Sequence, residues 1–227
     1  MRYQLQFASL VEYWPTFLAG AWTTIQFTAI ATVLGLALGI LGAIARGSRI
    51  GWLRLVAGAY VEVVRNTPFL IQIFFLFFGL ASMGLRMPIF VAAILAMVIN
   101  VGAYSTEIVR AGIESVHPSQ VEAAESLGLS TFQIYRDIIL RPALERVYPS
   151  LTSQFTLMML MSSVTSQVSA EELTGAANSI QSITFRSMET YLVVGLLYLL
   201  LTLLLKAGFW GLGLMLFPRR RRLGTPL

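Results

Sequence analysis

The sequence predicts an all-α membrane protein with five transmembrane helices, with the N-terminus outside the membrane and the C-terminus in the cytoplasm. Of the 227 residues, 56% are hydrophobic and only 12% are charged, whereas soluble domains carry about 25% charged residues. The apolar residues gather in stretches that match the roughly 20 residues needed to cross the hydrocarbon core. We therefore expect residues 1–227 to form a single transmembrane domain.

The positions of the arginines predict the orientation. Arg46, Arg49 and Arg54 follow the first apolar stretch, and the run Arg219-Arg220-Arg221-Arg222 follows the last one. Loops rich in Lys and Arg remain cytoplasmic, and such a run also binds the anionic headgroups of membrane lipids. This placement explains the net charge of +5 without nucleic acid as a partner.

The predicted spans cover residues 17–45, 58–80, 88–110, 149–170 and 190–217. The first span far exceeds the apolar part of a signal peptide. It contains Gly35, Gly39 and Gly42 at three- and four-residue spacing, which is typical of a face that packs closely against another helix. Ordinary tolerance of glycine in membrane helices is the alternative explanation.

The second span begins with two charged residues that share one helix face. Glu62 and Arg65 are three residues apart, so they can form an ion pair or reach the interface separately. Pro68 follows them and predicts either a kink or a helix start.

Polar side chains mark the third and fourth spans. Asn100 and Tyr104 are four residues apart and so share a helix face. Gln154, Ser162 and Ser163 belong to a fourth span that is rich in hydroxyl groups. Such groups can form hydrogen bonds between helices, but so many of them in one span favour the lining of a wet path.

A polar segment, residues 118–142, separates the third and fourth spans. It contains two signatures of the capping-box type, Ser119 with Glu122 and Ser130 with Gln133. Gly128 lies between them, where a left-handed helix end is favourable. The segment therefore predicts a cytoplasmic helix-turn-helix element, and Pro142 is expected to end its second helix.

Three functions are possible for this polar segment. A DNA-binding helix is disfavoured because Arg136 is balanced by Asp137. A purely structural re-entrant loop remains possible. Docking to a cytoplasmic partner fits best, because Phe132 and Tyr135 lie on the apolar face of an amphipathic helix.

The chain has few of the residues that enzyme sites need. It has no cysteine and a single histidine, His117, which excludes a Cys-based or His-cluster metal site. Lys206 is the only lysine and no glycine-rich phosphate loop precedes it. We therefore expect no catalysis and no metal or cofactor in this chain, and an energy source in another subunit. A stand-alone gradient-driven transporter or channel is the alternative.

Glu122-Ala123-Ala124, followed after three residues by Gly128, resembles the EAA loop of bacterial ABC-importer permeases. Residues 20–26, 60–68, 100–110 and 172–174 extend the resemblance over nearly the whole chain, to the polar amino-acid branch (histidine, glutamate, glutamine and arginine types). Asn66 replaces a glycine common in the family, and Pro142 is shifted by one position. Leu160 and Met161 stand where the family commonly has a charged Lys-Asp pair, so inferences about the substrate that rely on that pair do not apply to this chain.

The resemblance implies the permease subunit of an ATP-driven amino-acid importer in the bacterial inner membrane, working by alternating access. Its partners would be two ATPase subunits that bind ATP, a second identical or related permease, and a periplasmic amino-acid-binding protein. The residues expected to couple the chain to the ATPase are Glu122, Ala123, Ala124, Gly128, Phe132 and Tyr135. Those expected to line the substrate path are Asn100, Tyr104, Gln154, Ser162 and Ser163.

Overall fold

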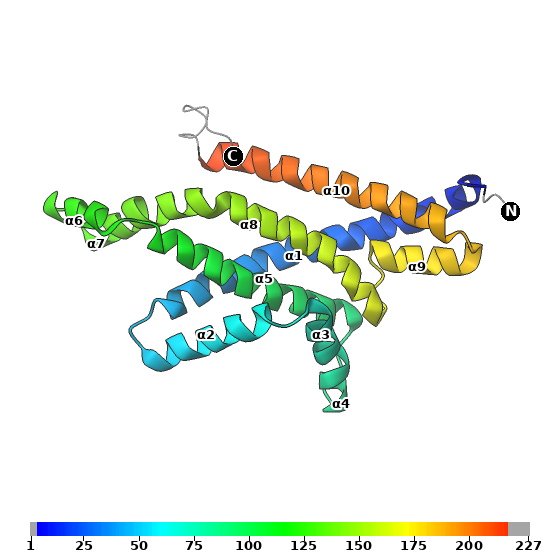
Figure 1. The fold of residues 1–227 in the computed structure, drawn as a ribbon, viewed down its shortest axis with the longest axis horizontal. Helices are drawn as coiled ribbons and strands as arrows, with labels where there is room; N and C mark the ends of the chain where they lie inside the picture. The colour runs from blue at the N-terminus through cyan, green and yellow to red at the C-terminus, as the bar shows by residue number, and fades with distance from the viewer. Residues whose placement is uncertain (1–3, 218–227) are drawn as a thin grey trace.

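The computed structural model describes residues 4–217 and contains only helices and connecting turns in that range. Most of the helices run along one long axis (Figure 1). The arginine run Arg219–Arg222, which the sequence places in the cytoplasm, lies outside the described residues. The elements are, in order, a 3-10 turn (Ala8–Tyr13), α1 (Trp14–Arg46), α2 (Gly51–Arg65), α3 (Phe69–Phe74), a π-helical turn (Phe75–Gly79), α4 (Leu80–Ser82), α5 (Ile89–Glu114), α6 (Pro118–Ser126), α7 (Thr131–Gln133), a π-helical stretch (Ile134–Leu140), α8 (Arg141–Met161), a 3-10 stretch (Ser162–Val168), α9 (Leu173–Thr184) and α10 (Ser187–Leu216).

Several of these helices have the length and hydropathy of membrane spans. Three qualify in the described part of the chain, the continuous helix Ala8–Arg46, α5 and α10, and the pair of α2 with α3–α4 makes a fourth when it is counted as one bent span. The prediction of an all-helical membrane protein is thus confirmed. In the predicted fourth span, residues 149–170, α8 ends at Met161 and a 3-10 stretch continues to Val168.

The main core lies where α1, α5 and α8 pack together, and its buried side chains include Phe27, Val101 and Met158. Gly35, Gly39 and Gly42 are all buried in α1. A Cβ atom at Gly35 would lie 2.5 Å from Val101 Cγ1 on α5, so the two backbones approach too closely for any side chain there. The predicted glycine packing face is confirmed.

The chain bends sharply between α2 and α3. The axes of the two helical pieces differ by 109°, and Pro68, in an extended conformation, precedes the first residue of α3. A proline fits this position because it lacks the N–H that a helix start leaves unpaired. Pro68 therefore marks a helix start, one of the two predicted outcomes.

The ion pair of Glu62 with Arg65, one of the two arrangements that the sequence allowed, does not form. Glu62 accepts a hydrogen bond from Asn66 Nδ2 at 3.0 Å, and the Arg65 guanidinium lies 5.2 Å from the centroid of the Tyr104 ring. Glu62 thus contacts a residue one turn further along the chain, whereas Arg65 contacts a different helix, α5.

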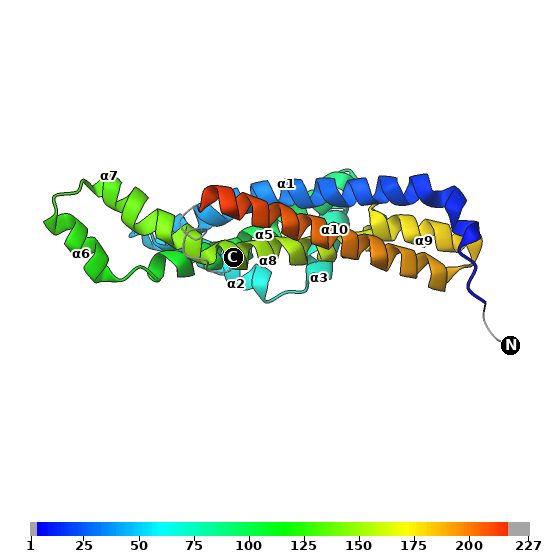
Figure 2. The ribbon, with the colours of Figure 1, turned by 90° about the horizontal axis from the view of Figure 1, so that it is seen from above.

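The polar segment forms α6 and α7 at the end of the molecule opposite α9, as Figures 1 and 2 both show. Gly128 has a φ of +73°, the left-handed conformation predicted for the turn. Ser130 and Gln133 form the predicted capping box, with the Ser130 hydroxyl accepting from the Gln133 N–H and the Gln133 side chain accepting from the Ser130 N–H.

The first predicted capping box is wrong. His117, not Ser119, is the N-cap of α6, and its side chain accepts a hydrogen bond from the Ser119 N–H. Pro118 occupies the first turn, where its fixed φ favours helix initiation. This proline starts the helix two residues before the Ser119–Glu122 signature would.

Pro142 does not end the second helix, so that prediction is also wrong. The chain continues helically from α7 through the π-helical stretch into α8, which contains both Pro142 and Pro149. Pro142 is the second residue after the π-helical stretch, where the hydrogen-bond pattern changes register. A missing N–H is best accommodated at such a discontinuity. The result is one long helix from Thr131 to Met161.

Candidate functional site

The end of the molecule formed by α6 and α7, residues 117–140, carries an exposed apolar surface, which we call the tip. The exposed fractions are 80% for Leu127, 70% for Phe132 and 62% for Tyr135. Such a cluster at the end of a protein indicates a contact surface for a partner. Of the remaining predicted coupling residues, Glu122, Ala123 and Gly128 are exposed, whereas Ala124 is buried and packs inward.

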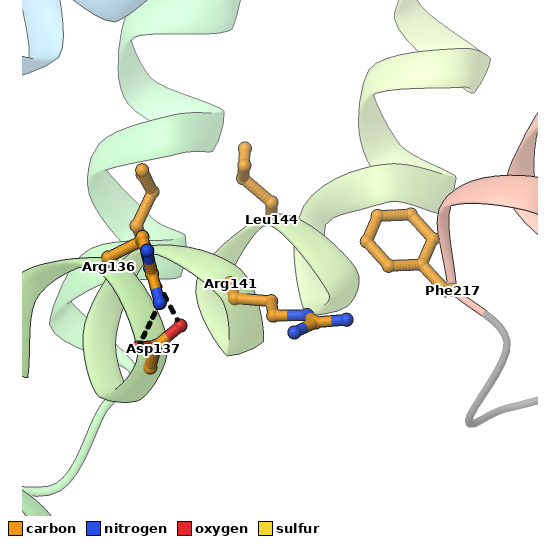
Figure 3. Close-up of a pocket in the computed structure, with 6 residues that line it drawn as sticks. Arg136, Asp137, Arg141, Leu144 and Phe217 are labelled. Atoms are coloured by element: carbon orange, nitrogen blue, oxygen red, sulfur yellow. Dashed lines mark hydrogen bonds and ion pairs between the residues drawn. The ribbon is translucent and has the colours of Figure 1, made fainter. Parts of the chain in front are cut away.

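A small pocket lies where the tip joins α8. Its volume is about 360 Å³, and Figure 3 shows the residues around it: Arg136, Asp137, Leu140, Arg141, Leu144 and Phe217. Arg136 donates from Nε and Nη2 to the two Asp137 oxygens, each at 3.0 Å. This guanidinium holds the pKa of the Asp137 carboxyl below its usual range. Arg141 adds a further positive charge beside the end of α10.

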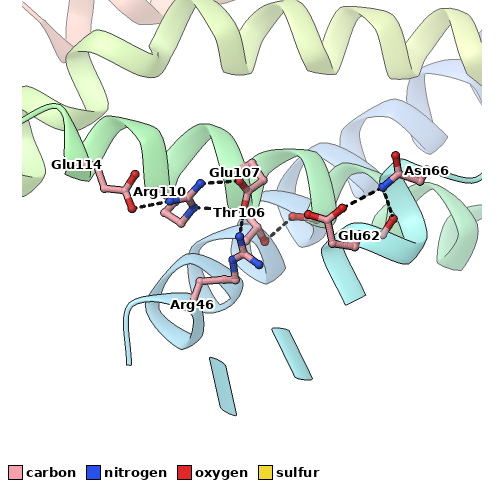
Figure 4. A network of polar contacts seen from close by, with 8 residues as sticks. Arg46, Glu62, Asn66, Thr106, Glu107, Arg110 and Glu114 are labelled. Atoms are coloured by element: carbon pink, nitrogen blue, oxygen red, sulfur yellow. Dashed lines mark hydrogen bonds and ion pairs between the residues drawn. The ribbon is translucent and has the colours of Figure 1, made fainter. Parts of the chain in front are cut away.

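A network of charged side chains lies near the end of α5 that leads to the tip (Figure 4). The Glu107 carboxylate contacts Arg46 of α1 at 3.3 Å and Arg110 of α5 at 2.8 Å. Arg110 also pairs with Glu114 one turn further along. Glu107 therefore shares its charge between two arginines and joins α1 to α5.

Arg146 connects α8 to the last turn of α5. Its Nη1 donates to the Ser115 carbonyl at 2.6 Å and to the Ser115 hydroxyl at 2.8 Å. One turn earlier on α5, a Cβ at Gly112 would lie 2.5 Å from Val147 Cγ1 and 3.2 Å from the Ala143 carbonyl oxygen. The start of the tip is thus fixed to α8 by close packing and by these hydrogen bonds.

Gln72 organises the bend between α2 and α3, although sequence reasoning did not identify it. Its Nε2 donates to the carbonyl of Val64 at 2.7 Å and to that of Thr67 at 3.0 Å, so it satisfies groups that the end of α2 leaves unpaired. Its Oε1 accepts from Asn100 Nδ2 at 2.9 Å. The sequence does contain a signal for this role, because a glutamine between two isoleucines in an otherwise apolar segment indicates a buried polar contact.

The predicted path residues fall into two groups. Asn100 is 3% exposed and its Oδ1 has no hydrogen-bond partner in the described part of the chain; one turn away, Tyr104 lies under Arg65. Ser162 and Ser163 donate to the carbonyls of Met159 and Leu160, and Gln154 is partly buried on α8. Among residues 4–217, no hydrogen bond joins the first group to the second.

A buried carboxylate lies near the opposite end of the molecule. Glu172 is fully buried and caps α9 by accepting from the Gly175 N–H at 2.9 Å. Its other oxygen accepts from the Tyr198 hydroxyl of α10 at 2.6 Å. Thr24 of α1 accepts from the Leu173 N–H at 3.2 Å. Sequence reasoning did not assign Glu172 a role, and the structure shows that it joins α9 to α10, together with the hydrogen bonds of Thr174 with Tyr198 and of Tyr191 with Asn178.

The described residues hold no group of three or more His, Cys, Asp or Glu side chains that could bind a metal ion. A second pocket, of about 430 Å³, lies along α5 and α8 and includes Arg65, Glu107, Arg110 and Arg146 in its lining.

Residues 35–209 match the model of a protein family described as "binding-protein-dependent transport system inner membrane component". The nopaline transport system permease protein NocM of Agrobacterium fabrum is 33% identical over 217 residues, which cover 88% of this chain and 90% of that protein. A putative glutamine transport system permease protein GlnP of Rickettsia conorii is 32% identical and is matched over 88% of this chain and 93% of its own length.

Solved structures agree with these sequence relatives. The crystal structure of an amino acid ABC transporter with histidines has a chain that matches with a TM-score of 0.86 and 35% identity, over 93% of this chain and 99% of that one. The MetNI methionine ABC transporter, in inward-facing conformations, matches with a TM-score of 0.72 at 20% identity, a likeness of fold. The EAA loop and the matching segments singled out in the sequence thus led to the same family.

Proposed function

We propose a specific role for this chain, which belongs to the family of binding-protein-dependent transport system inner membrane components. It is a permease subunit of an ABC importer for amino acids, as its relatives are. In the proposed role it carries a polar amino acid across the bacterial inner membrane by alternating access. The energy comes from ATP, which two partner ATPase subunits bind and hydrolyse.

The proposed topology has five crossings in one domain of residues 1–227, with the N-terminus outside and the C-terminus inside. α1, α5 and α10 make three crossings, and the bent pair of α2 with α3–α4 makes another. α8 with the 3-10 stretch that follows it makes the fifth. The tip and Arg46, Arg49 and Arg54 then share the cytoplasmic side, in agreement with the positive-inside rule.

The exposed apolar surface of the tip is the observation that carries the coupling role. Leu127, Phe132 and Tyr135 are largely exposed in the described part of the chain, and apolar side chains on a helix typically enter a partner's groove. Because the buried Ala124 and the left-handed Gly128 fix the turn after α6, the tip docks on the ATPase as a rigid body, with Glu122 and Ala123 on its exposed surface.

The proposed substrate path runs past Asn100, Tyr104, Gln154, Ser162 and Ser163. The unpaired Asn100 Oδ1 supports it, since a buried acceptor without a partner is costly unless water or a ligand reaches it. A second permease subunit, identical or related, completes the path, and a periplasmic binding protein delivers the amino acid. Gln154→Leu should slow transport while assembly with the ATPase remains intact.

Substitution of Gly128 tests the coupling role. Proline cannot adopt the φ of +73° found there, so Gly128→Pro should distort the turn and abolish ATP-driven uptake. Asparagine tolerates a left-handed conformation, so Gly128→Asn is the matched control and should retain most of the activity. Uptake is measured in proteoliposomes that contain the complete transporter, and membrane insertion is checked for both variants. Normal uptake by Gly128→Pro would exclude the docking role.

A transporter or channel that works alone is the alternative, and the family relatives do not favour it. Purified permease reconstituted without any ATPase distinguishes the two. The proposal predicts no amino-acid flux in that preparation, and flux above that of empty vesicles would favour the alternative.

A further inference from the structure

Lys206 is a charged residue in the apolar part of α10. It is the only lysine of the chain, and no other charged residue occurs between Glu189 and Arg219. The 30 residues of α10 span about 45 Å, which places Lys206 about 7 Å from the middle of the helix. With α10 centred on the membrane, the lysine lies inside a hydrocarbon core that extends about 15 Å on each side of the midplane. A charged residue at this depth is costly and marks a binding site or a pathway.

The ammonium group of Lys206 has no charged partner in the described part of the chain, because no carboxylate there lies within 4.0 Å of it. Lipid phosphates lie outside the hydrocarbon core, and in the proposed topology the nearer layer of them is at the C-terminal end of α10. Side chains of a helix tilt toward its N-terminus, so Lys206 leans away from that layer. The anion that neutralises it is therefore expected in the transport path.

Lys206 lines a pocket between α8 and α10. The pocket volume is about 310 Å³, which is at the lower end of the range for small-molecule sites. Thr152, Ser153 and Thr156 belong to its α8 side. Ser153 directly precedes Gln154 of the proposed path, so the pocket adjoins that path.

The hydroxyl groups of the pocket complement the lysine. Thr152 Oγ1 donates to the Pro149 carbonyl at 3.0 Å, and Thr156 Oγ1 donates to the Thr152 carbonyl at 2.8 Å. A hydroxyl that has donated its hydrogen keeps its lone pairs, so both threonines can still accept from an ammonium group. The pocket thus offers a cationic donor on α10 and acceptors on α8, as the zwitterionic part of an amino acid requires.

The donor and the acceptors lie at the same level of the two helices. The rings of Phe155 on α8 and Phe209 on α10 have centroids 5.8 Å apart. Thr152 and Thr156 are each within one turn of Phe155, and Lys206 is within one turn of Phe209. One amino acid can therefore contact both helices at once.

We propose that the Lys206 ammonium binds the α-carboxylate of the transported amino acid in this pocket, while Thr152 and Thr156 accept hydrogen bonds from its α-ammonium group. The inference rests on the proposed function, because it takes the transported amino acid from there. It adds a charged contact to a path for which only uncharged residues were predicted. Because it uses groups that all amino acids share, this contact is independent of the side chain that is carried.

Binding without the periplasmic protein tests the proposal. Uptake by the complete transporter in proteoliposomes, from a radiolabelled mixture of the twenty standard L-amino acids, first identifies the amino acid that is carried. The permease with its ATPase partner, in nanodiscs of phosphatidylcholine, is then dialysed to equilibrium against that amino acid and against the amine that lacks its α-carboxylate, as histamine compares with histidine. The amino acid should bind about tenfold more tightly, as expected when a charge-assisted hydrogen bond is lost.

Variants assign the effect to residues. Lys206→Cys should weaken binding of the amino acid about tenfold, and Thr156→Val, which removes one acceptor, about threefold. Leu203→Cys is the matched control, because Leu203 is an exposed residue of α10 outside the pocket lining. It should bind as the parent does. Gel filtration and thermal unfolding verify that each variant is folded.

The absence of cysteine from the chain allows the charge to be restored chemically. Alkylation of the new thiol of Lys206→Cys by 2-bromoethylamine, with loss of bromide, adds an ammonium group at nearly the length of lysine, whereas iodoacetamide adds a neutral amide. The ammonium should return the affinity to within about threefold of the parent, and the amide should leave it about tenfold weaker. The parent complex, treated in the same way, corrects for cysteines of the ATPase.

Several outcomes would overturn the proposal. They are no binding by the parent permease, equal binding of the amine, unchanged affinity in folded Lys206→Cys, and equal rescue by the two reagents. Loss of amino-acid binding when phosphatidylglycerol is added to the nanodiscs would also overturn it, since an anionic lipid would then occupy Lys206. Normal uptake by the complete transporter together with any of these outcomes refutes only the Lys206 site, whereas absent uptake refutes the proposed function itself.

Discussion

Replacement of Gly35 by alanine tests the close packing of α1 on α5. The new methyl carbon would lie 2.5 Å from Val101 Cγ1 and 3.3 Å from the Val98 carbonyl oxygen. Val101 is fully buried and β-branched, so its side chain cannot easily rotate away. The two helices must therefore separate locally by about 1 Å, and overpacking of this kind costs about 1–3 kcal/mol.

Gly208 on α10 provides the matched control. A Cβ built there meets no atom within 4 Å. Alanine is favoured over glycine in a helix by about 0.8–1 kcal/mol at both positions, so the difference between the two variants isolates the packing cost. We expect Gly208→Ala to be slightly more stable than the parent protein, and Gly35→Ala to be about 1–3 kcal/mol less stable than Gly208→Ala.

The free energy of unfolding can be measured in mixed micelles by titration with SDS, with helix content followed by circular dichroism. This readout needs no cysteine label, which suits a chain without cysteine. Equal stability of the two alanine variants would refute the packing argument, since it would mean that α1 and α5 have room for a methyl group.

Other substitutions can be checked by the same titration. Ser169→Gly should raise the free energy of unfolding by about 1 kcal/mol, because Ser169 has a φ of +64°, which is strained for a serine; a decrease would contradict this. Gln72→Leu should lower the free energy of unfolding by about 2–4 kcal/mol, because the buried Asn100 amide and the backbone carbonyls at the bend lose their partner. An unchanged free energy would show that water replaces the side chain. Glu172→Ala should lower the free energy of unfolding by about 2–4 kcal/mol, because α9 loses its cap and the Tyr198 hydroxyl loses its acceptor. Glu172→Gln should lower it less, because glutamine keeps an acceptor oxygen. Equal losses in the two variants would argue against the hydrogen bonds as the cause.

Local signals predicted the tip well. The turn at Gly128 and the capping box of Ser130 with Gln133 depend on residues within four positions of each other, so their geometry follows from the sequence alone. The failure at Ser119 shows the limit of this reasoning. Two start signals competed there, and the fixed φ of Pro118 at the first position placed the cap on His117.

Partners across helices could not be predicted in the same way. The spacing of Glu62 and Arg65 allowed an ion pair within α2, but the Arg65 guanidinium lies over the Tyr104 ring of α5 instead. At the 109° bend, Gln72 forms hydrogen bonds with carbonyls at the end of α2 and with Asn100 of α5. Such choices depend on the three-dimensional neighbourhood, which single-helix periodicity does not contain.

The serines of the fourth span show a further limit. Ser162 and Ser163 were predicted to face a wet path, yet both hydroxyls donate to carbonyls of their own helix end. Hydroxyl side chains near a helix end compete for backbone acceptors, and a count of hydroxyl groups cannot distinguish this from a lining. Their place on the path stays a prediction.

The uninterrupted helix from Thr131 to Met161 has a mechanical consequence. It is roughly 45 Å long, and a close contact with α5, where Ala143 and Val147 meet Gly112, lies near its middle. Roughly 20 Å of helix lies on each side of this contact, and on the side away from the tip Leu151, Phe155 and Met158 are buried in the main core. A force applied at the tip is therefore transmitted along one helix directly into the packing of α8 against α1 and α5.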